Sequence, residues 1–271
     1  MGTPEESAVR FAGQIPELYD TLLVPMLFDP YAVDVCSRVQ LAEGSLLEVA
    51  AGTGAVTRRL AAALPETVTI VATDLNQPML DRAAARGTTR PVTWRQADAM
   101  ALPFDDASFD VVVCQFGAMF FPDKATAYAS VRRVLRPGGR FVFDVWGPID
   151  DSPLAACVRD ALADVFDDPP QFLARVPHGY HDPVRIAADL AAGGFAAPPQ
   201  IDVVDLRCRA ASAAEASTAF CYGTPTRNDV EARDPAALDR VAERVTALIT
   251  ERFGATDVDA PMRALVVTVE A

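Results

Sequence analysis

The sequence LLEVAAGTG at residues 46–54 decides the fold of this chain. A short apolar run ends in the acid Glu48, and two alanines and two closely spaced glycines follow it. A helical pattern then covers residues 55–63, so we expect a buried parallel strand, a tight turn and a helix N-terminus. The turn would bring a ligand against bare backbone, because glycine has no Cβ atom to keep it away. The helix N-terminus beyond it favours a negatively charged group, such as a carboxylate.

Strand and helix patterns alternate on both sides of this stretch. The strand patterns cover residues 46–50, 68–73, 92–96, 109–114 and 140–146, and helical patterns fill 55–64, 77–86 and 123–135. The sequence RPGG at 136–139 ends a helix and turns the chain into the next strand. Strands that alternate with helices predict right-handed crossovers and a parallel sheet.

The remaining segments complete a single α/β domain over residues 1–271. We expect an N-terminal helical cap at 1–45, a cofactor-binding core at 46–147, cap inserts on the acceptor side at 148–182 and 212–252, and last strands at 201–209 and 264–269. A further helix covers 183–192. The sheet should have seven strands, mostly parallel, with an antiparallel last strand, and the cap helices should lie over its carboxyl edge.

The composition limits the possible partners. The net charge is −13 and the isoelectric point is near 4.6, which disfavours a nucleic acid or an anionic membrane as partner. No apolar run approaches the roughly 18 residues that cross a bilayer, and residues 1–10 are too polar for a secretory signal. Five scattered cysteines without a Cys-x-x-Cys pair fit a reduced, cytoplasmic protein with no metal site. Lys124 is the only lysine, which argues against Schiff-base chemistry.

The end of the second strand carries Asp74, 20 residues beyond Gly54. This is about the spacing at which an acid meets the hydroxyls of a ribose, and a carboxylate can accept from both hydroxyls. The alternative is a solvated cap of the helix that begins near residue 77. Leu75 and Met79 would supply apolar contacts to an adenine, although Met79 fits the ordinary core equally well.

The third and fourth strands end in groups of the same kind. Asp98 suits the amino group of an adenine, and the N–H of Ala99 suits a ring nitrogen. Gln115 and Phe116 close the fourth strand. Glu48 could meet an ammonium group near that point, directly or through water.

A nicotinamide dinucleotide is a second reading of the glycine-rich turn. Its fingerprint requires Gly-x-Gly-x-x-Gly, and Thr57 stands at the third glycine position. Glu48 would also place a negative charge near the phosphates. Both observations disfavour a dinucleotide.

In order and spacing, these segments resemble class I S-adenosylmethionine-dependent methyltransferases, in particular the group that includes the ubiquinone and menaquinone methyltransferases. The resemblance covers roughly residues 46–146, and it departs from the usual motif in having Ala50 at the first glycine position. It implies a Rossmann-like fold and methyl transfer. Family membership does not fix the methyl acceptor, but the large cap inserts and the negative net charge favour a small molecule. The resemblance also implies S-adenosylmethionine binding by Glu48, Ala50, Gly52, Gly54, Asp74, Asp98, Ala99 and Gln115, with Tyr19 closing over the cofactor. Two alternatives stay open, namely a cyclase-like catalyst that does not transfer methyl groups and a protein that senses the cofactor.

The acceptor side offers fewer signals. His178 and His181 are the only histidines, and either could act as a general base because histidine titrates near neutral pH. The alternative is a simple turn, in which Asp182 caps the helix that starts near Pro183. Tyr222 could line the acceptor pocket or be an ordinary packed tyrosine. Phe116, Phe120 and Phe121 could form an apolar wall beside the methyl group or belong to the core.

Overall fold

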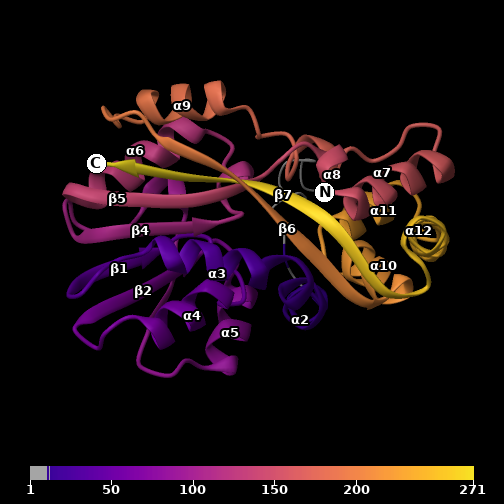
Figure 1. The fold of residues 1–271 in the computed structure, drawn as a ribbon, viewed down its shortest axis with the longest axis horizontal. Coiled ribbons are helices and arrows are strands. Elements are labelled where there is room, and N and C mark those ends of the chain that lie inside the picture. The colour runs from indigo at the N-terminus through magenta and orange to yellow at the C-terminus, as the bar shows by residue number, and fades with distance from the viewer. Residues whose placement is uncertain (1–10, 12) are drawn as a thin grey trace. The chain divides into compact units, whose positions relative to one another are not determined.

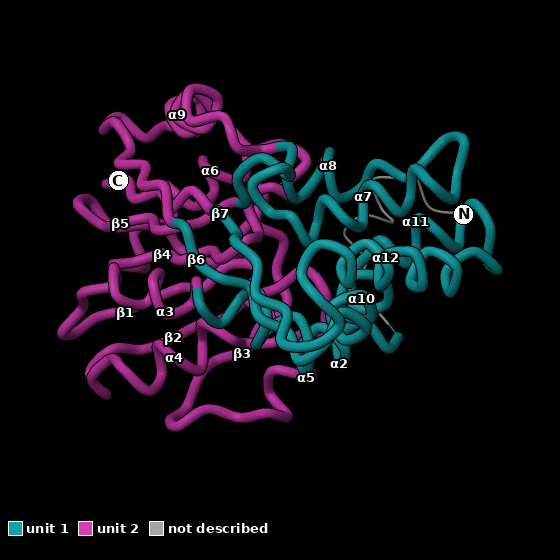
Figure 2. Tube along the Cα trace, turned by 45° about the vertical axis from the view of Figure 1, so that its right-hand side comes forward, with its two compact units in different colours: residues 1–30, 146–179, 205–263 teal, residues 31–145, 180–204, 264–271 magenta. Residues whose placement is uncertain are grey.

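The structure, a computed structural model, describes residue 11 and residues 13–271. The chain forms two compact units, drawn in two colours in Figure 2. Unit 1 comprises residues 1–30, 146–179 and 205–263, and unit 2 comprises residues 31–145, 180–204 and 264–271. The strand and turn at residues 46–54 lie in unit 2.

A seven-stranded sheet organises the chain (Figure 1). Its strands are β1 Gly44–Glu48, β2 Val68–Asp74, β3 Thr93–Gln96, β4 Phe109–Gln115, β5 Leu135–Trp146, β6 Gln200–Ser212 and β7 Thr256–Glu270, in the spatial order β3-β2-β1-β4-β5-β7-β6. The strands β1 to β5 pair in parallel, with Glu48 opposite Ala72 on β2 and Val113 on β4. The carboxyl ends of these strands therefore meet at one edge.

The last two strands run antiparallel to their neighbours. The Ala271 N–H donates to the Gly139 carbonyl at 2.8 Å, and the Gly147 N–H donates to the Arg263 carbonyl at 2.9 Å. In these two pairs the residue number rises along one strand as it falls along the other, which is the pattern of an antiparallel pair. The Ala213 N–H donates to the Ala255 carbonyl in the same sense between the ends of β6 and β7. The predicted mostly parallel sheet with an antiparallel end is confirmed.

Helices connect the strands within each unit. Unit 2 holds most of α3 Asp29–Arg38, together with α4 Ala55–Ala63, α5 Gln77–Arg86, α6 Lys124–Val134, α9 Pro183–Ala192 and the short 3-10 helices η2 Ala99–Ala101 and η3 Ala118–Phe120. Unit 1 holds α2 Ile15–Leu18, the π-helix η1 Tyr19–Phe28, η4 Ile149–Asp151, α7 Pro153–Val165, α8 Phe172–Arg175, α10 Ala213–Tyr222, α11 Thr226–Arg233 and α12 Leu238–Phe253.

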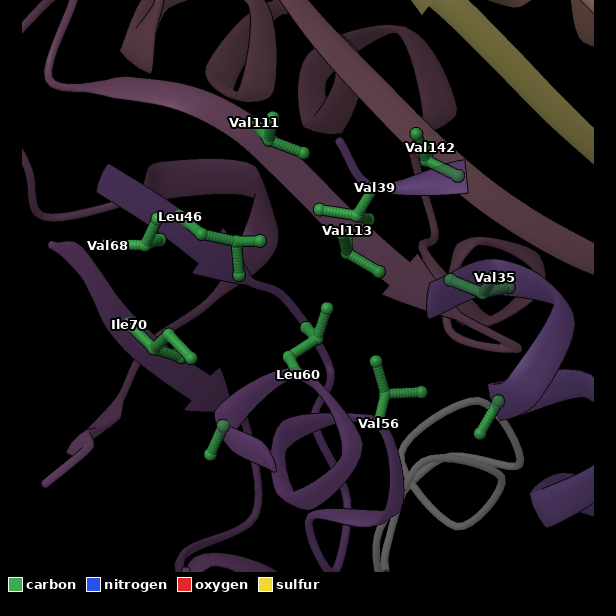
Figure 3. Close-up of a cluster of buried hydrophobic side chains, with 12 residues drawn as sticks. Val35, Val39, Leu46, Val56, Leu60, Val68, Ile70, Val111, Val113 and Val142 are labelled. Carbon is green, nitrogen blue, oxygen red and sulfur yellow. The ribbon is translucent and has the colours of Figure 1, made fainter. Parts of the chain in front are cut away.

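Two layers of apolar side chains cover the sheet of unit 2. On one face, Val35 of α3, Leu60 of α4 and Val142 of β5 belong to one buried cluster (Figure 3). Phe141 and Phe143 stack on each other, and both contact the ring of Tyr128 on α6. Because successive strand residues point to opposite faces, β5 packs against helices on both sides.

Several element boundaries differ from the sequence prediction, and the strand expected at 46–50 is Gly44–Glu48. The helix expected at 123–135 ends at Val134, and β5 begins at Leu135 rather than at residue 140. The strands expected at 201–209 and 264–269 extend to Gln200–Ser212 and Thr256–Glu270, because ion pairs such as Arg207–Asp259 hold polar sequence in the ladder. The helical stretch expected at 212–252 is divided into α10, α11 and α12, with breaks near Pro225 and Pro235.

The expected N-terminal cap is helical where the structure describes it, in α2, η1 and α3; residues 1–10 and 12 lie outside the described residues. The interpretation of the chain as a single domain, and the placement of the cap helices over the carboxyl edge, stay predictions. Within the described part of the chain, no helix is both long and apolar enough to cross a membrane.

Candidate functional site

The turn between β1 and α4 has an unusual backbone. Ala50, Gly52 and Gly54 all have positive φ angles, of 55°, 57° and 81°. Glycine adopts this left-handed region freely, whereas Ala50 does so at a cost. The Val49 N–H donates to the Val113 carbonyl and the Ala51 N–H to the Thr73 carbonyl, each at 2.8 Å. The neighbouring strands therefore hold the turn in place at the carboxyl edge.

Asp74 joins this turn to the end of β2. Its Oδ2 accepts the Gly52 N–H at 2.8 Å, and its Oδ1 accepts the Asn76 N–H at 2.8 Å. Burial raises the pKa of Asp74, and the hydrogen bonds from Asn76 and Gly52 oppose that rise. The N-cap of α5 is Asn76, so Asp74 is not itself the cap of that helix. The carboxylate instead lies against the bare backbone of the turn.

Glu48 is buried at the end of β1, directly before the turn. The Thr57 hydroxyl of α4 donates to its Oε2 at 2.5 Å. Burial raises the pKa of Glu48 to about 8, and the Thr57 hydrogen bond and the charge of Arg58 oppose the rise only in part. A cationic group bound nearby would favour the ionised form of this carboxyl group.

The end of β3 lies beside Asp74, since the Ala97 N–H donates to the Asp74 carbonyl at 3.0 Å. Asp98 is exposed and caps η2 by accepting the Met100 N–H at 2.9 Å, and Ala99 is buried. Leu75 is 48% exposed, so its apolar surface is available to a ligand. Met79 is 3% exposed, which fits the core interpretation of that residue.

The end of β4 completes the edge. Phe116 has a positive φ of 46°, and its N–H donates to Asp144 Oδ1 on β5 at 2.6 Å. The Phe116 ring packs edge-to-face on Tyr31 of α3, 5.3 Å between centroids. A Cβ atom on Gly117 would lie 2.5 Å from the Cβ of Ala50, so the two turns fit closely against each other. Phe121 is buried as well, and Phe120 is partly buried.

The edge as a whole suits a nucleoside that carries positive charge. It combines bare backbone with the acids Glu48, Asp74 and Asp98, which can pair with a cation and offer a phosphate no positive partner. The Thr53 hydroxyl in the turn is buried and has no hydrogen-bond partner among the described residues. Buried polar atoms are usually paired, so this atom is a candidate ligand contact.

The acceptor-side candidates lie partly in the other unit. His178 of unit 1 is buried, with Nδ1 2.8 Å from the Gly147 carbonyl and its ring 6.0 Å from that of Trp146. The Tyr222 hydroxyl of unit 1 donates to Asp239 at 2.5 Å, and burial together with that bond raises its pKa to about 12. Tyr19 stacks on Phe28 in η1, 4.8 Å between centroids.

His181 lies in unit 2 and directly precedes Asp182. Asp182 accepts the Val184 N–H at 2.9 Å and caps α9, as the turn interpretation predicted. The roles of Tyr19, His178, His181 and Tyr222 toward a ligand stay predictions. Among the described residues, no group of three or more His, Cys, Asp or Glu side chains could hold a metal ion.

Sequence reasoning missed two polar residues at this edge. Thr57 reads as an ordinary helix residue, yet it holds Glu48. Asp144 stands in the strand sequence FVFDVW, and an acid inside an apolar strand was the signal that could have found it.

Comparison with known proteins shows what this chain is similar to. Residues 47–143 match the methyltransferase domain family, and the fold is the Rossmann-like fold of class I methyltransferases. A protein YcgJ from Bacillus subtilis has a TM-score of 0.54 and 17% identity, covering 89% of this chain and 98% of that one. A Haemonchus contortus phosphoethanolamine N-methyltransferase, solved with S-adenosylhomocysteine and phosphomonomethylethanolamine, has a TM-score of 0.58 and 15% identity, covering 94% and 56%.

The relatives that match by sequence carry a more specific name than the structural neighbours. Over 123 residues the chain is 40% identical to a ubiquinone/menaquinone biosynthesis C-methyltransferase, UbiE, of Ectopseudomonas mendocina. The match covers 44% of this chain and 47% of that relative, so the chain spans about half the length of the curated relatives it matches. Residues 47–143 thus match a methyltransferase domain family, and the resemblance found in the sequence is confirmed.

Proposed function

We propose that this protein is an S-adenosylmethionine-dependent methyltransferase that acts on a small-molecule acceptor and releases S-adenosylhomocysteine. The observation that carries the proposal is the contact between Asp74 and the Gly52 N–H, which fixes a carboxylate against a turn of bare backbone. This is the arrangement that a ribose bound over the turn requires. The matched methyltransferase domain covers the same residues.

Each part of the cofactor has candidate partners in unit 2. Asp74 would accept from the ribose hydroxyls, Asp98 and the Ala99 N–H would meet the adenine edge, and Leu75 would cover its face. The buried carboxyl group of Glu48 and the side chain of Gln115 would meet the ammonium group of the methionine part. Gly52 and Gly54 would allow the close approach of the cofactor to the backbone, and Ala50 is nearly as small.

When bound, the cofactor supplies a methyl group on a sulfonium centre. The protein's contribution is to hold the acceptor in line with the S–CH₃ bond and to exclude water, because a displacement of this kind depends strongly on positioning. A general base is required only if the acceptor is protonated at the working pH. His178 and His181 stay candidates for that role.

The acceptor is a small molecule in this proposal, and the protein acts in the cytoplasm. A net charge of −13 disfavours nucleic acid as a substrate. The curated relatives are named as ubiquinone/menaquinone biosynthesis C-methyltransferases, but the match to the first of them covers only 44% of this chain. The acceptor therefore requires its own experiment, a transfer screen with methyl-labelled cofactor.

Titration calorimetry with S-adenosylhomocysteine tests the cofactor site. The Asp74→Ala change should weaken binding by about 1–3 kcal/mol, because the hydroxyl contacts are lost. Asp81→Ala is the matched control, since Asp81 lies on the neighbouring helix α5 and accepts a hydrogen bond from the exposed Gln77 side chain at 2.7 Å. The control should bind like the wild type. Equal affinity of the Asp74→Ala protein and the wild type would remove Asp74 from the site.

A further inference from the structure

Asp144 is a buried carboxyl group that neither the sequence analysis nor the proposed cofactor contacts use. It stands on β5 opposite Gln115 in the parallel pairing of β4 and β5. Val142, two residues earlier, belongs to the apolar cluster with Leu46 and Val113. Strand alternation therefore places Asp144 on the same face of the sheet as Glu48 and Gln115, at the same carboxyl edge.

Asp144 contacts the backbone at the point where β4 ends. Its Oδ1 accepts the Phe116 N–H at 2.6 Å. Phe116 has a φ of 46°, in the left-handed region that a residue with a side chain adopts at a cost of about 1–2 kcal/mol. The hydrogen bond stabilises this conformation, and with it the turn through Gly117, which packs against Ala50 of the first turn.

The surroundings of Asp144 favour its neutral form. The side chain is fully buried, and burial raises the pKa of Asp144 well above its usual range, against weaker opposing effects of the Phe116 N–H and the Gln115 side chain. Asp34 of α3 adds a nearby negative charge, and Glu48 and Cys114 are the other titratable groups of this region. Oδ2 has no hydrogen-bond partner among the described residues. A buried polar atom without a hydrogen-bond partner lowers the stability of the fold. Folding stability alone therefore does not explain an aspartate at position 144.

We propose that Asp144 is a positioning residue of the cofactor site, whose carboxyl group fixes the backbone of residues 115–117 where the methionine part of the cofactor binds. The inference rests on the proposed function. It differs from the roles of Glu48 and Asp74, because Asp144 acts through the backbone of Phe116 rather than by touching the cofactor.

The test measures the affinity for S-adenosylhomocysteine in two variants of Asp144. Asp144→Ala removes the acceptor and should weaken binding roughly 10-fold or more. Asp144→Asn keeps an oxygen for the Phe116 N–H and resembles the neutral acid, so it should restore affinity to within about 2-fold. Amide hydrogen exchange at Phe116 should be faster in Asp144→Ala and unchanged in Asp144→Asn.

The control lies at the other end of the neighbouring strand β4. Asp110 of β4 accepts the Ser45 N–H at 2.8 Å, a carboxyl-to-backbone contact away from the carboxyl edge, and it also pairs with Arg136. Asp110→Ala should lower stability without changing cofactor affinity, which separates general loosening of the sheet from an effect on the site. If Asp144→Ala does not fold, Asp144→Val replaces it, because valine fills the space and suits a buried strand.

The possible failures are distinct. If the wild type and all variants fail to bind S-adenosylhomocysteine, the proposed function is wrong. If the wild type binds and the Asp144→Ala or Asp144→Val protein binds equally well, the positioning role of Asp144 is wrong. A 10-fold loss in Asp144→Asn would also contradict the positioning role, since the asparagine keeps an oxygen for the Phe116 N–H.

Discussion

Glu48 shows how one residue links the fold to the pH at which it is stable. Its carboxyl group is buried beside Thr57, and burial raises its pKa from about 4.5 to about 8. The folded protein therefore holds a proton that the unfolded chain releases above pH 4.5. The stability that this proton contributes is fully present below pH 4.5 and is lost as the pH rises to about 8.

Replacing Glu48 should remove this dependence. The free energy of unfolding of the cofactor-free wild type should fall between pH 5 and 8 by about 1 kcal/mol or more, and Glu48→Gln should flatten that part of the profile. Urea denaturation at several pH values measures both proteins. Asp74 and Asp144 also have raised pKa values and stay in the variant, so the difference between the two profiles isolates Glu48. Parallel profiles would show that Glu48 is ionised in the folded protein.

Ala50 and Gly117 form a second residue-scale pair. A Cβ atom on Gly117 would meet the Cβ of Ala50 at 2.5 Å and the Sγ of Cys114 at 2.7 Å. Gly117→Ala should therefore destabilise the protein by about 1–3 kcal/mol through overpacking. Adding Ala50→Gly should recover part of that loss, because it removes one of the two clashes and the positive φ of an alanine. Denaturation of the two single variants and the double variant measures the coupling, and additive effects within about 0.5 kcal/mol would contradict the close fit.

At the scale of elements, the sequence predicted the type of most helices and strands in unit 2. Buried parallel strands such as β1 and β4 are short apolar runs, and α5 and α9 have clear apolar periodicity, so local pattern and tertiary environment agree. The extension of β6 and β7 could not be predicted, because polar residues such as Asp205 and Arg263 pair across the strands only after the sheet has formed. The π-helix η1 has no local signature in the sequence.

The candidate site likewise contains residues that the sequence predicts and residues that it does not. Glu48, Gly52 and Asp74 stand at strand ends and in a short motif, so their spacing alone brought them together. Asp144 stands far along the chain from the first turn, and only the pairing of β4 with β5 places it beside Phe116. The structure therefore adds supporting contacts that spacing cannot give.

His178 connects the segment after α8 to the end of β5 within unit 1. Because its ring is buried against Trp146 and its Nδ1 lies 2.8 Å from the Gly147 carbonyl, His178→Ala should lower the free energy of unfolding by about 1–3 kcal/mol. His178→Asn should lower it less, since the asparagine amide can donate in place of Nδ1. Denaturation measures stability, and turnover of the folded variants with an identified acceptor should stay within a few-fold of the wild type. A loss of turnover by roughly 10²–10⁴-fold at unchanged cofactor affinity would instead assign catalysis to His178.

At the scale of the whole molecule, residues 47–143 match a methyltransferase domain family, and this match lies outside unit 1. The sequence of the domain carries the proposed cofactor site. The acceptor has no comparable motif, because acceptor contacts depend on side chains from scattered loops whose identity the fold does not fix. The alternative of a cyclase-like catalyst therefore remains an outcome of the acceptor screen, in which cofactor would bind without a methylated product.

The central claim is that the carboxyl edge of unit 2 binds S-adenosylmethionine over the turn at residues 50–54. A crystal structure of the protein with S-adenosylhomocysteine tests this claim most directly. We expect electron density for the ribose within hydrogen-bond distance of Asp74. The adenine should lie beside Asp98 and Ala99, and the amino acid part should point toward Glu48 and Gln115. Density for the ligand at another place, or a ribose without contact to Asp74, would contradict it.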